Sequence, residues 1–464
     1  MSEAKSMSQE EHWSGRIGFT LATIGSAVGL GSIWKFPYEV GTNGGSAFVF
    51  CYLAGLVIVV LPLMLAEFSI GRRGAADPAT ALARIAEAHG GSSSWALAGA
   101  LGVATGFLIL SFYAVIGGWT LDYAVGVAIL GVPSSSASAQ AQFDHLVASP
   151  LRMLVSQTLF MTATALIVAR GVAKGIEAVC RILMPLLILM IAALAGFSMM
   201  TGESATTLRY LFGFDLDRFT VRGALEALGL GFFSIGVGLS LMITYAPYAG
   251  REVNLRQAAL MTLGGDTLIS FLAGMAIFPI VFRAGLDPAS GPGLMFISLP
   301  IGFARLPFGQ LWALAFYILL FIAALASAIS LLELVVACWL RQRLSISRIW
   351  ASAIASAACW VTGFLTVFSF NHLKDWRPLR AVPSLGDANA YEGLDHLTSN
   401  LMLPLGGLLI AIFAGWVMPS SVLAAELGVG QVAARVLQAA LRYVVPAAIA
   451  LATAAPLVLS AVGW

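Results

Sequence analysis

The residues best suited to bind a charged ligand form a weak helical stretch in the first apolar segment. Residues 25–32 read Gly-Ser-Ala-Val-Gly-Leu-Gly-Ser, with three glycines in seven positions. Each glycine costs about 1 kcal/mol relative to alanine in a helix interior, so the stretch favours unwound backbone with free carbonyl and N–H groups. Inside a bilayer, such backbone is tolerated only against protein or a water-filled cavity. The stretch is therefore predicted to be a broken helix at a binding site.

A second glycine-interrupted stretch lies in the sixth apolar segment. Residues 233–240 read Phe-Ser-Ile-Gly-Val-Gly-Leu-Ser. Breaks at corresponding places in two five-helix halves, the second half starting from the opposite side, predict an inverted-repeat secondary transporter with a site at the membrane midplane. The alternative is that the glycines only let helices pack closely, as small residues often do in membranes. The matching positions favour the first interpretation.

The composition predicts that membrane helices position these two stretches. The 464 residues are 59% hydrophobic and 10% charged, with a mean hydropathy of +0.90, which is typical of a polytopic membrane protein. The net charge of +2 and the dispersed basic residues argue against a nucleic-acid partner. The cysteines lie in apolar segments without metal-ligand spacing and are expected to be unpaired packing residues: Cys51, Cys180, Cys338 and Cys359.

At roughly 20 apolar residues per span, we expect eleven transmembrane helices. They are predicted at about 16–38, 46–71, 95–130, 152–170, 176–201, 223–247, 256–283, 310–340, 347–370, 399–419 and 436–462. Basic residues crowd into the short connections on one side, which predicts a cytoplasmic N-terminus without a removable signal peptide and a C-terminus outside. The expected units are a cytoplasmic segment (1–15), a first repeat (16–201), an outer loop (202–222), an inverted repeat (223–420) and a last helix (421–464).

Motifs along the chain resemble those of the neurotransmitter:sodium symporter family. In the first span they are His12-Trp13, Arg16 to Phe19, Gly25 to Gly31, Lys35 to Tyr38 and Asn43-Gly44-Gly45. Further along they are Pro62-Leu63, Glu67, Gly71-Arg72, Ile243-Thr244-Tyr245, Gly291-Pro292-Gly293 and Leu331-Leu332-Glu333. The resemblance covers roughly residues 10–420. It implies an all-α polytopic membrane protein with the leucine-transporter-like fold, an inverted five-helix repeat with broken helices 1 and 6.

The resemblance also implies the activity: sodium-coupled import of an amino acid by alternating access, at the plasma membrane and specifically the bacterial inner membrane. The expected partners are the small-molecule substrate and the lipid bilayer, and the expected state is a monomer or weak homodimer. Sodium would be the transported coupling ion, with no organic cofactor. The sequence shows no nucleophile–base pair, metal-ligand cluster or phosphate loop, so we do not expect an enzyme.

An amino acid brings a carboxylate and an ammonium into a low-dielectric site, where each needs dedicated partners. By resemblance, the carboxylate would meet the N–H groups of Leu30 and Gly31, where the helix dipole favours an anion, together with the Tyr113 hydroxyl. The alternative for Tyr113 is a packing role only. The ammonium would face the carbonyls of Ala27 and Phe233. The other implied members of the substrate site are Ser26, Val28, Ile109, Ser234, Gly236, Leu239, Ser327 and Leu331.

The implied lining is mainly apolar, which favours a hydrophobic or aromatic amino acid. Gly236 stands where family members often have serine, and Leu239 stands where they often have an aromatic residue. Both replacements would leave extra volume, so we expect large aliphatic or aromatic substrates. The alternative is that these residues line the helices as apolar residues do in every membrane helix.

Sodium, a hard cation, is expected to prefer oxygen ligands. The resemblance places a first ion at the Ala27 carbonyl and the side chains of Ser32, Ser234 and Asp266. It places a second ion at the carbonyls of Gly25, Val28 and Ala323 and the hydroxyl of Ser327. Three departures affect these sites: Ser32 is a shorter ligand where asparagine is usual, Asp266 adds a charge where asparagine is usual, and Ala326 removes an oxygen where threonine is usual.

The charge of Asp266 also bears on chloride. The residues at the family's chloride positions are Tyr52, Leu230, Ser234 and Ser270, so the usual glutamine is missing and Asp266 already supplies a negative charge. We therefore expect transport to be chloride-independent. A carboxylate inside a membrane helix is costly and by default functional. The alternative is a proton-coupled or single-ion carrier in which Asp266 takes up the proton.

The predicted gates also differ from the family pattern. Lys35 replaces the usual arginine outside the pocket, next to Phe233. Its acidic partner is not assigned: Asp395 is the nearest acid in the sequence, but the aligned position is occupied by Thr398. On the cytoplasmic side, Glu10 and Arg341 would form the usual ion pair with reversed signs, or be unrelated charges.

Glu67 is implied to accept hydrogen bonds from the unwound part of span six. A third possibility for the whole protein is a membrane receptor that binds an amino acid without transporting it.

Overall fold

The computed structural model describes residues 12–213, 219–288, 293–336, 346–380 and 386–462, and every regular element in these residues is a helix. Among the described residues, nine helices are long and apolar enough to cross a membrane, or ten if the bent pair in the first span counts as one. The predicted all-α architecture is therefore confirmed. The sixth predicted span is split into helices of 15 and 5 residues, each too short to count alone, so the total of eleven stays a prediction.

The helices of the first half follow the predicted spans closely. They are α2 (Arg16–Ala27) and α3 (Phe36–Thr42), α4 (Ser46–Gly55) and α5 (Leu61–Gly74), α7 (Ala96–Leu130), α9 (Pro150–Ala169) and α10 (Ala178–Thr201). Short π-helical segments extend them, including η1 (Gly31–Lys35) before α3 and η4 (Val172–Glu177) before α10.

The second half repeats this series. Its helices are α12 (Val221–Ile235) and α13 (Leu241–Tyr245), α14 (Leu255–Arg283), α16 (Gly309–Glu333), α18 (Arg348–Ser369), and α19 (Ala390–Asp395) with α20 (Leu403–Ile412). The last span consists of α22 (Gln431–Ala439) and α23 (Val445–Val462). Connections that the sequence did not mark as helical contain α6 (Pro78–Ala88), α8 (Ser136–Val147), α11 (Ser204–Phe212), α15 (Leu299–Ala304) and α21 (Ser420–Leu427).

Local sequence signals set where several helices begin. The Asn254 side chain accepts hydrogen bonds from the N–H groups of the first two residues after Leu255 and so caps α14. Ser149 caps α9 in the same way, and Pro150 occupies the first helical position, where its missing N–H costs nothing.

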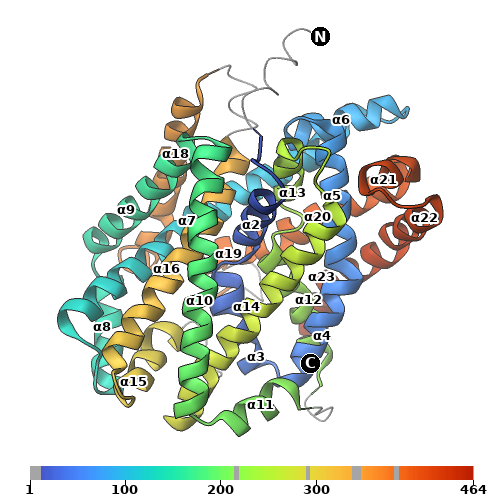
Figure 1. The fold of residues 1–464 in the computed structure, drawn as a ribbon. Coiled ribbons are helices and arrows are strands. Elements are labelled where there is room, and N and C mark those ends of the chain that lie inside the picture. Colours follow the sequence, from blue (N-terminus) through green and yellow to red (C-terminus); the bar gives the residue numbers. More distant parts are fainter. Residues whose placement is uncertain (1–11, 214–218, 289–292, 337–345, 381–385, 463–464) are drawn as a thin grey trace.

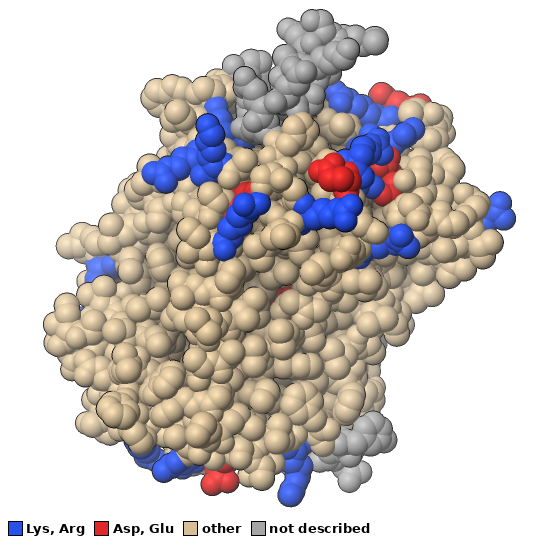
Figure 2. Space-filling view, in the orientation of Figure 1, with Lys and Arg blue, Asp and Glu red and all other residues tan. Residues whose placement is uncertain are grey.

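The long helices pack around a central pair. Helices α7 and α16 lie side by side, α9 packs on α7 and α18, and α10 packs on α14 (Figure 1). Of the nine spans, α16 is the most buried. Figure 2 shows Lys and Arg gathered toward the end of the molecule where α2 begins, above a broad band with few charged residues. This distribution is what a bilayer requires of a polytopic protein.

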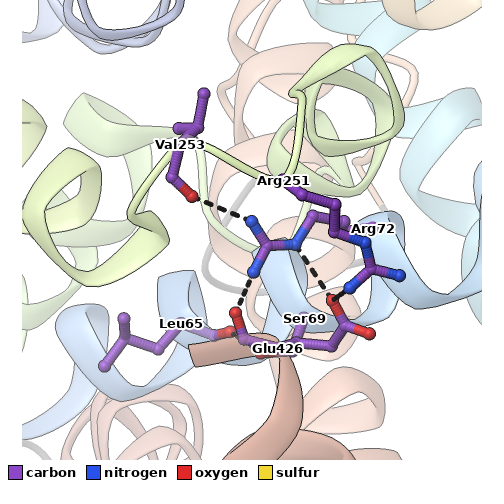
Figure 3. A network of polar contacts seen from close by, with 6 residues as sticks. All are labelled: Leu65, Ser69, Arg72, Arg251, Val253 and Glu426. Carbon is purple, nitrogen blue, oxygen red and sulfur yellow. Dashed lines mark hydrogen bonds and ion pairs between the residues drawn. The ribbon is translucent and has the colours of Figure 1, made fainter. Parts of the chain in front are cut away.

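An ion-pair network links three segments on the side of the molecule where α2 begins (Figure 3). Arg72 at the end of α5 lies 2.9 Å from the Glu426 carboxylate of α21 and donates to the Val253 carbonyl at 2.9 Å. Arg72 also donates to the Glu426 carbonyl, and Arg251 lies 3.2 Å from the same carboxylate. Since the Glu426 side chain is only 1% exposed, the network fastens α21 to the bundle through a buried charge.

Replacing Glu426 by alanine should destabilise the protein by about 3 kcal/mol, because it leaves Arg72 largely buried without its ion-pair partner. Thermal unfolding in detergent would measure the change. The matched control is Glu226→Ala, which breaks the exposed Arg222–Glu226 pair in α12 and should cost no more than about 0.5 kcal/mol. Equal effects of the two variants would contradict a structural role for the buried network.

Candidate functional site

The first helix is broken where the glycine stretch predicts. Helix α2 ends at Ala27, Val28 is extended (φ −73°, ψ 110°), and the chain resumes as η1 and α3 at a bend of 51°. The freed Val28 carbonyl accepts a hydrogen bond from the Ser327 hydroxyl of α16 at 3.0 Å. A Cβ atom on Gly29 would lie 2.3 Å from Ser327 Oγ and 2.8 Å from Tyr113 Oη. Only glycine therefore lets side chains of α7 and α16 approach the break.

The sixth span is also broken where predicted, at residues 236–240 between α12 and α13. Gly236 and Gly238 adopt φ values of +74° and +88°, the left-handed region that favours glycine. Glu67 of α5 accepts hydrogen bonds from the N–H groups of Gly238 (2.7 Å) and Met242 (3.2 Å). This buried carboxylate satisfies backbone donors that the break exposes, in the position that the family resemblance implies.

A cavity of about 40 Å³ lies between the two breaks and the central helices α7 and α16. The predicted substrate-site residues that line it are Ser26, Ala27, Leu30, Gly31, Ile109, Tyr113, Phe233, Ser234, Gly236, Leu239, Ser327 and Leu331. Val28 is the exception, although its carbonyl bonds to Ser327 at the edge of the cavity. The structure thus brings together residues from helices that are far apart in the sequence.

Three lining residues were missed by the sequence reasoning: Gly29, Leu241 and Leu403. Gly29 lies inside the first predicted stretch and could have been included directly, and Leu241 could have been found by extending the second stretch by one residue. Leu403 begins α20, and no motif in the sequence marks it.

The expectation of extra volume at Gly236 needs a correction. A Cβ atom at this position would lie 2.8 Å from Leu241 Cδ1, and the positive φ disfavours any other residue. Glycine is therefore required by the turn that ends α12, and Leu241 already fills the space beside it.

The lining of the cavity is partly polar. The Tyr113 hydroxyl, on α7, accepts a hydrogen bond from the Leu30 N–H at 3.1 Å. The Ser26 hydroxyl is buried and has no hydrogen-bond partner among the described residues. Aliphatic residues make up much of the rest of the lining: Ile109, Leu239, Leu241, Leu331 and Leu403. A ligand with both polar and apolar groups would match this mixed lining.

Hydroxyl groups surround the buried carboxylate of Asp266 in α14. Ser234 Oγ lies 3.0 Å from both carboxylate oxygens, Tyr52 Oη lies 3.1 Å from Oδ2, and Ser32 donates to Oδ1. Ser32 and Ser234 are themselves 3.1 Å apart. Within the described part of the chain, no Lys, Arg or His forms an ion pair with Asp266. A buried negative charge that meets only hydroxyl oxygens suits a small hard cation.

The residues of the second predicted ion site are partly brought together. Ser327 Oγ lies 3.0 Å from the Val28 carbonyl oxygen and 3.5 Å from that of Ser26. Gly25 lies on α2 and Ala323 lies one turn before Ser327 on α16, and these two helices pack against each other. Ala326 is fully buried, so its methyl group offers no oxygen where the family usually has one.

Lys35, which the family resemblance predicts at an outer gate, lies over the Phe233 ring, with its Nζ atom 4.4 Å from the ring centroid. This cation–π contact covers a ring that lines the cavity. Neither candidate acid partner is confirmed: Asp395 accepts from Ser399 at 2.8 Å, and the Thr398 hydroxyl donates to the Leu394 carbonyl. The inner gate pair, Glu10 and Arg341, lies outside the described residues.

A different contact closes the side on which α2 begins. The Trp13 indole N–H donates to the Tyr245 carbonyl at 3.2 Å, and the Trp13 backbone N–H donates to the Tyr248 carbonyl at 3.1 Å. These bonds hold the start of the first span against α13. Nearby, Glu333 of α16 forms a buried ion pair with Arg348 of α18, a role that the sequence did not reveal.

The expected cysteine chemistry also agrees with the structure. Cys51, Cys180 and Cys359 are unpaired and at least half-buried. Cys338 lies outside the described residues.

Comparison with known proteins decides the family. Residues 10–143 and 138–372 match the model of the sodium:neurotransmitter symporter family. The chain belongs to this family. It is 37% identical over 463 residues to the sodium-dependent transporter YhdH of Bacillus subtilis, covering 97% of each chain, and 31% identical over 430 residues to the transporter MJ1319 of Methanocaldococcus jannaschii, covering 88% and 82%.

The fold agrees with this assignment. The crystal structure of MhsT in complex with L-phenylalanine superposes with a TM-score of 0.87 at 38% identity, covering 96% of this chain and 99% of MhsT. The predicted leucine-transporter-like fold is confirmed, and the chain is a sodium-dependent membrane transporter rather than an enzyme.

Replacing Gly29 by alanine should destabilise the protein by about 1 to 3 kcal/mol, because the added methyl group overlaps Ser327 and Tyr113. The matched control is Gly264→Ala in α14, where an added Cβ meets nothing within 4 Å and a helical alanine should cost nothing. Thermal unfolding of both variants in detergent checks the prediction. If Gly29→Ala unfolds at the same temperature as the control variant, the close approach of α7 and α16 to the first break does not require glycine.

Proposed function

We propose that this transporter imports a hydrophobic or aromatic amino acid together with sodium, by alternating access. The observation that carries the proposal is the cavity between the two helix breaks, whose lining combines the hydroxyl-bearing residues Ser26, Tyr113, Ser234 and Ser327 with aliphatic side chains. The likeness to MhsT, whose crystal structure holds L-phenylalanine, supports the same class of cargo.

The polar groups of the lining would bind the amino and carboxyl groups of the substrate. The N–H groups of Leu30 and Gly31 begin the outer half of the first span, where the helix dipole attracts a carboxylate. Tyr113 already touches the Leu30 N–H and can donate its hydroxyl hydrogen to the same carboxylate. The ammonium would face the carbonyls of Ala27 and Phe233.

The size of the cavity supports a cycle with moving walls. About 40 Å³ has room for a few water molecules but not for an aromatic side chain. The site is covered on one side by Lys35 over Phe233 and on the other by Trp13 bound to Tyr245 and Tyr248. Substrate entry and release then require these two covers to open in turn.

Asp266 is proposed as the principal sodium ligand. The carboxylate and the hydroxyls of Ser32 and Ser234 are grouped within hydrogen-bonding distance of one another, and a bound cation would balance the buried charge. The second site, at Val28 and Ser327, has one oxygen fewer than the family pattern because of Ala326, so we expect it to bind more weakly.

Chloride independence follows from the same cluster. Tyr52 and Ser234, which occupy chloride positions of the family, donate to Asp266 instead. Leu230, which occupies the position of the usual glutamine, is buried and offers no donor. An anion there would also be repelled by the carboxylate.

We also propose that the side on which α2 begins faces the cytoplasm of a cell whose plasma membrane holds the protein. The crowding of Lys and Arg on that side supports this orientation (Figure 2).

Uptake by reconstituted vesicles tests the cargo and the driving ion. Labelled leucine, tryptophan, tyrosine and phenylalanine should accumulate under an inward sodium gradient, and unlabelled glycine should compete poorly. A proton gradient alone should drive no accumulation. Accumulation under protons without sodium would indicate the carrier that uses Asp266 for a proton, and saturable binding without accumulation under either gradient would indicate a receptor.

Replacing Asp266 by asparagine should raise the half-saturating sodium concentration for substrate binding at least about tenfold, because a buried charge no longer faces the cation. Wild-type binding should be unchanged when gluconate replaces chloride. The control is Asp144→Asn on the exposed face of α8, which removes the same charge far from the site. Unaltered sodium dependence in the Asp266 variant, or a chloride requirement in the wild type, would contradict the assignment.

A further inference from the structure

A groove of about 450 Å³ lies on the outer surface between α9 and α18, away from the transport site. The two helices lie side by side (Figure 1). The residues that line the groove are Thr158, Met161, Thr162, Ala165, Leu166, Ala169, Ile349, Ser352, Ala353, Ser356, Ala357 and Trp360. Both helices are apolar spans, so the groove opens toward hydrocarbon when the protein is in a membrane.

Polar contacts at both ends hold the groove open. At one end Arg348 of α18 donates to the Val168 carbonyl of α9 at 2.8 Å and pairs with Glu333 behind it. At the other end the Trp360 indole donates to the Thr158 hydroxyl at 2.9 Å. Between these contacts the facing residues are mostly alanine and serine, whose small side chains leave a gap between the two helix backbones.

The length of the groove corresponds to one leaflet of a bilayer. From Thr158 to Ala169, the lining of α9 spans twelve residues, whose eleven rises of about 1.5 Å give about 16 Å of helix. This is about half of a hydrocarbon core roughly 30 Å thick. A groove of this length can hold one acyl chain of the leaflet on the side where α9 ends.

A hydroxyl near that end has no protein partner. Ser352 lines the groove, is 1% exposed, and its Oγ atom has no hydrogen-bond partner among the described residues. It lies one turn from the start of α18. The ester carbonyls of a phospholipid lie at a similar depth, just inside the headgroup, and such a carbonyl could accept from this hydroxyl.

Two cations follow the end of α9 in the sequence. Arg170 directly follows Ala169, and Lys174 lies in the next turn of chain, within η4. Both are exposed, and neither forms an ion pair with another described residue. The segment belongs to the side on which α2 begins, because Glu177 at the end of η4 accepts a hydrogen bond from the Ser14 N–H at 2.8 Å.

From these observations we propose that the α9–α18 groove binds an acidic phospholipid of the leaflet on the α2 side. One acyl chain fills the gap between the helices, and an ester carbonyl accepts a hydrogen bond from the Ser352 hydroxyl. The anionic headgroup lies at Arg170 and Lys174. The charge of these two residues selects the headgroup, because each Lys or Arg near a membrane surface favours an anionic lipid about fivefold.

Lipid binding by the full-length protein tests the proposal. Delipidated wild-type protein in mild detergent is titrated with dioleoyl phosphatidylglycerol or dioleoyl phosphatidylcholine, and bound lipid is counted by native mass spectrometry. The wild type should bind one phosphatidylglycerol several-fold more tightly than phosphatidylcholine. Equal binding of the two lipids would overturn the proposal.

Two variants locate the lipid. Ala353→Leu combined with Ala357→Leu fills the groove with exposed side chains and should abolish the tight lipid, whereas Ala192→Leu, exposed on α10, should not. Arg170→Gln should reduce the preference for phosphatidylglycerol about fivefold, whereas Arg435→Gln, an exposed cation on α22, should leave it unchanged.

Unchanged thermal unfolding in lipid-free detergent would show that the filled variant is folded. Retention of the tight lipid by that folded variant would overturn the proposal. Conversion of a wild-type dimer to a monomer in the filled variant, with lipid binding unchanged, would also overturn it and would assign the groove to a second copy of the chain. The Arg170→Gln test does not depend on filling the groove, since it changes only an exposed side chain.

Discussion

Unwound backbone inside a hydrocarbon layer must find a partner for every N–H and carbonyl group that it releases, and this requirement shapes the centre of the transporter. At the first break, the Val28 carbonyl accepts a hydrogen bond from Ser327 and the Leu30 N–H donates to Tyr113. At the second break, two N–H groups donate to the Glu67 carboxylate. Three spans outside the broken pair therefore supply side chains to the breaks. A ligand or ion can take the place of one of these side-chain partners at little cost in free energy, so the same unwound backbone can form a binding site.

In the neighbouring cluster, Asp266 adds a charged group to a set of hydroxyls. The hydroxyls are neutral and need no counter-ion. The Asp266 carboxylate does need one, because it is buried among hydroxyls and meets no protein cation in the described residues. A cation bound beside this carboxylate would balance a charge that meets no protein cation in the described part of the chain.

Much of the fold could be predicted because membrane spans are long and apolar, and because glycines interrupt only two of them in matching places. Most of the lining of the central cavity could be predicted through the family motifs, which identify residues on separate helices. Leu403 could not be placed, since its position depends on how α20 crosses the second break. The volume at Gly236 could not be judged either, because the sequence does not show that Leu241 turns back toward it. Helices in the connections, such as α8 and α11, are short and less apolar, so hydropathy alone does not find them.

The two hydrogen bonds of Trp13 have a mechanical consequence. Both end on carbonyl groups of the sixth span, so they depend on the path of that backbone rather than on its side chains. A motion that separates the start of the first span from the end of the sixth must break both bonds together. A motion that carries α2 and α13 together keeps both bonds and breaks two hydroxyl contacts with α16 instead: Ser327 to Val28, and Tyr245 to Ser330 at 2.7 Å. The Trp13 bonds therefore couple the start of the first span to the end of the sixth.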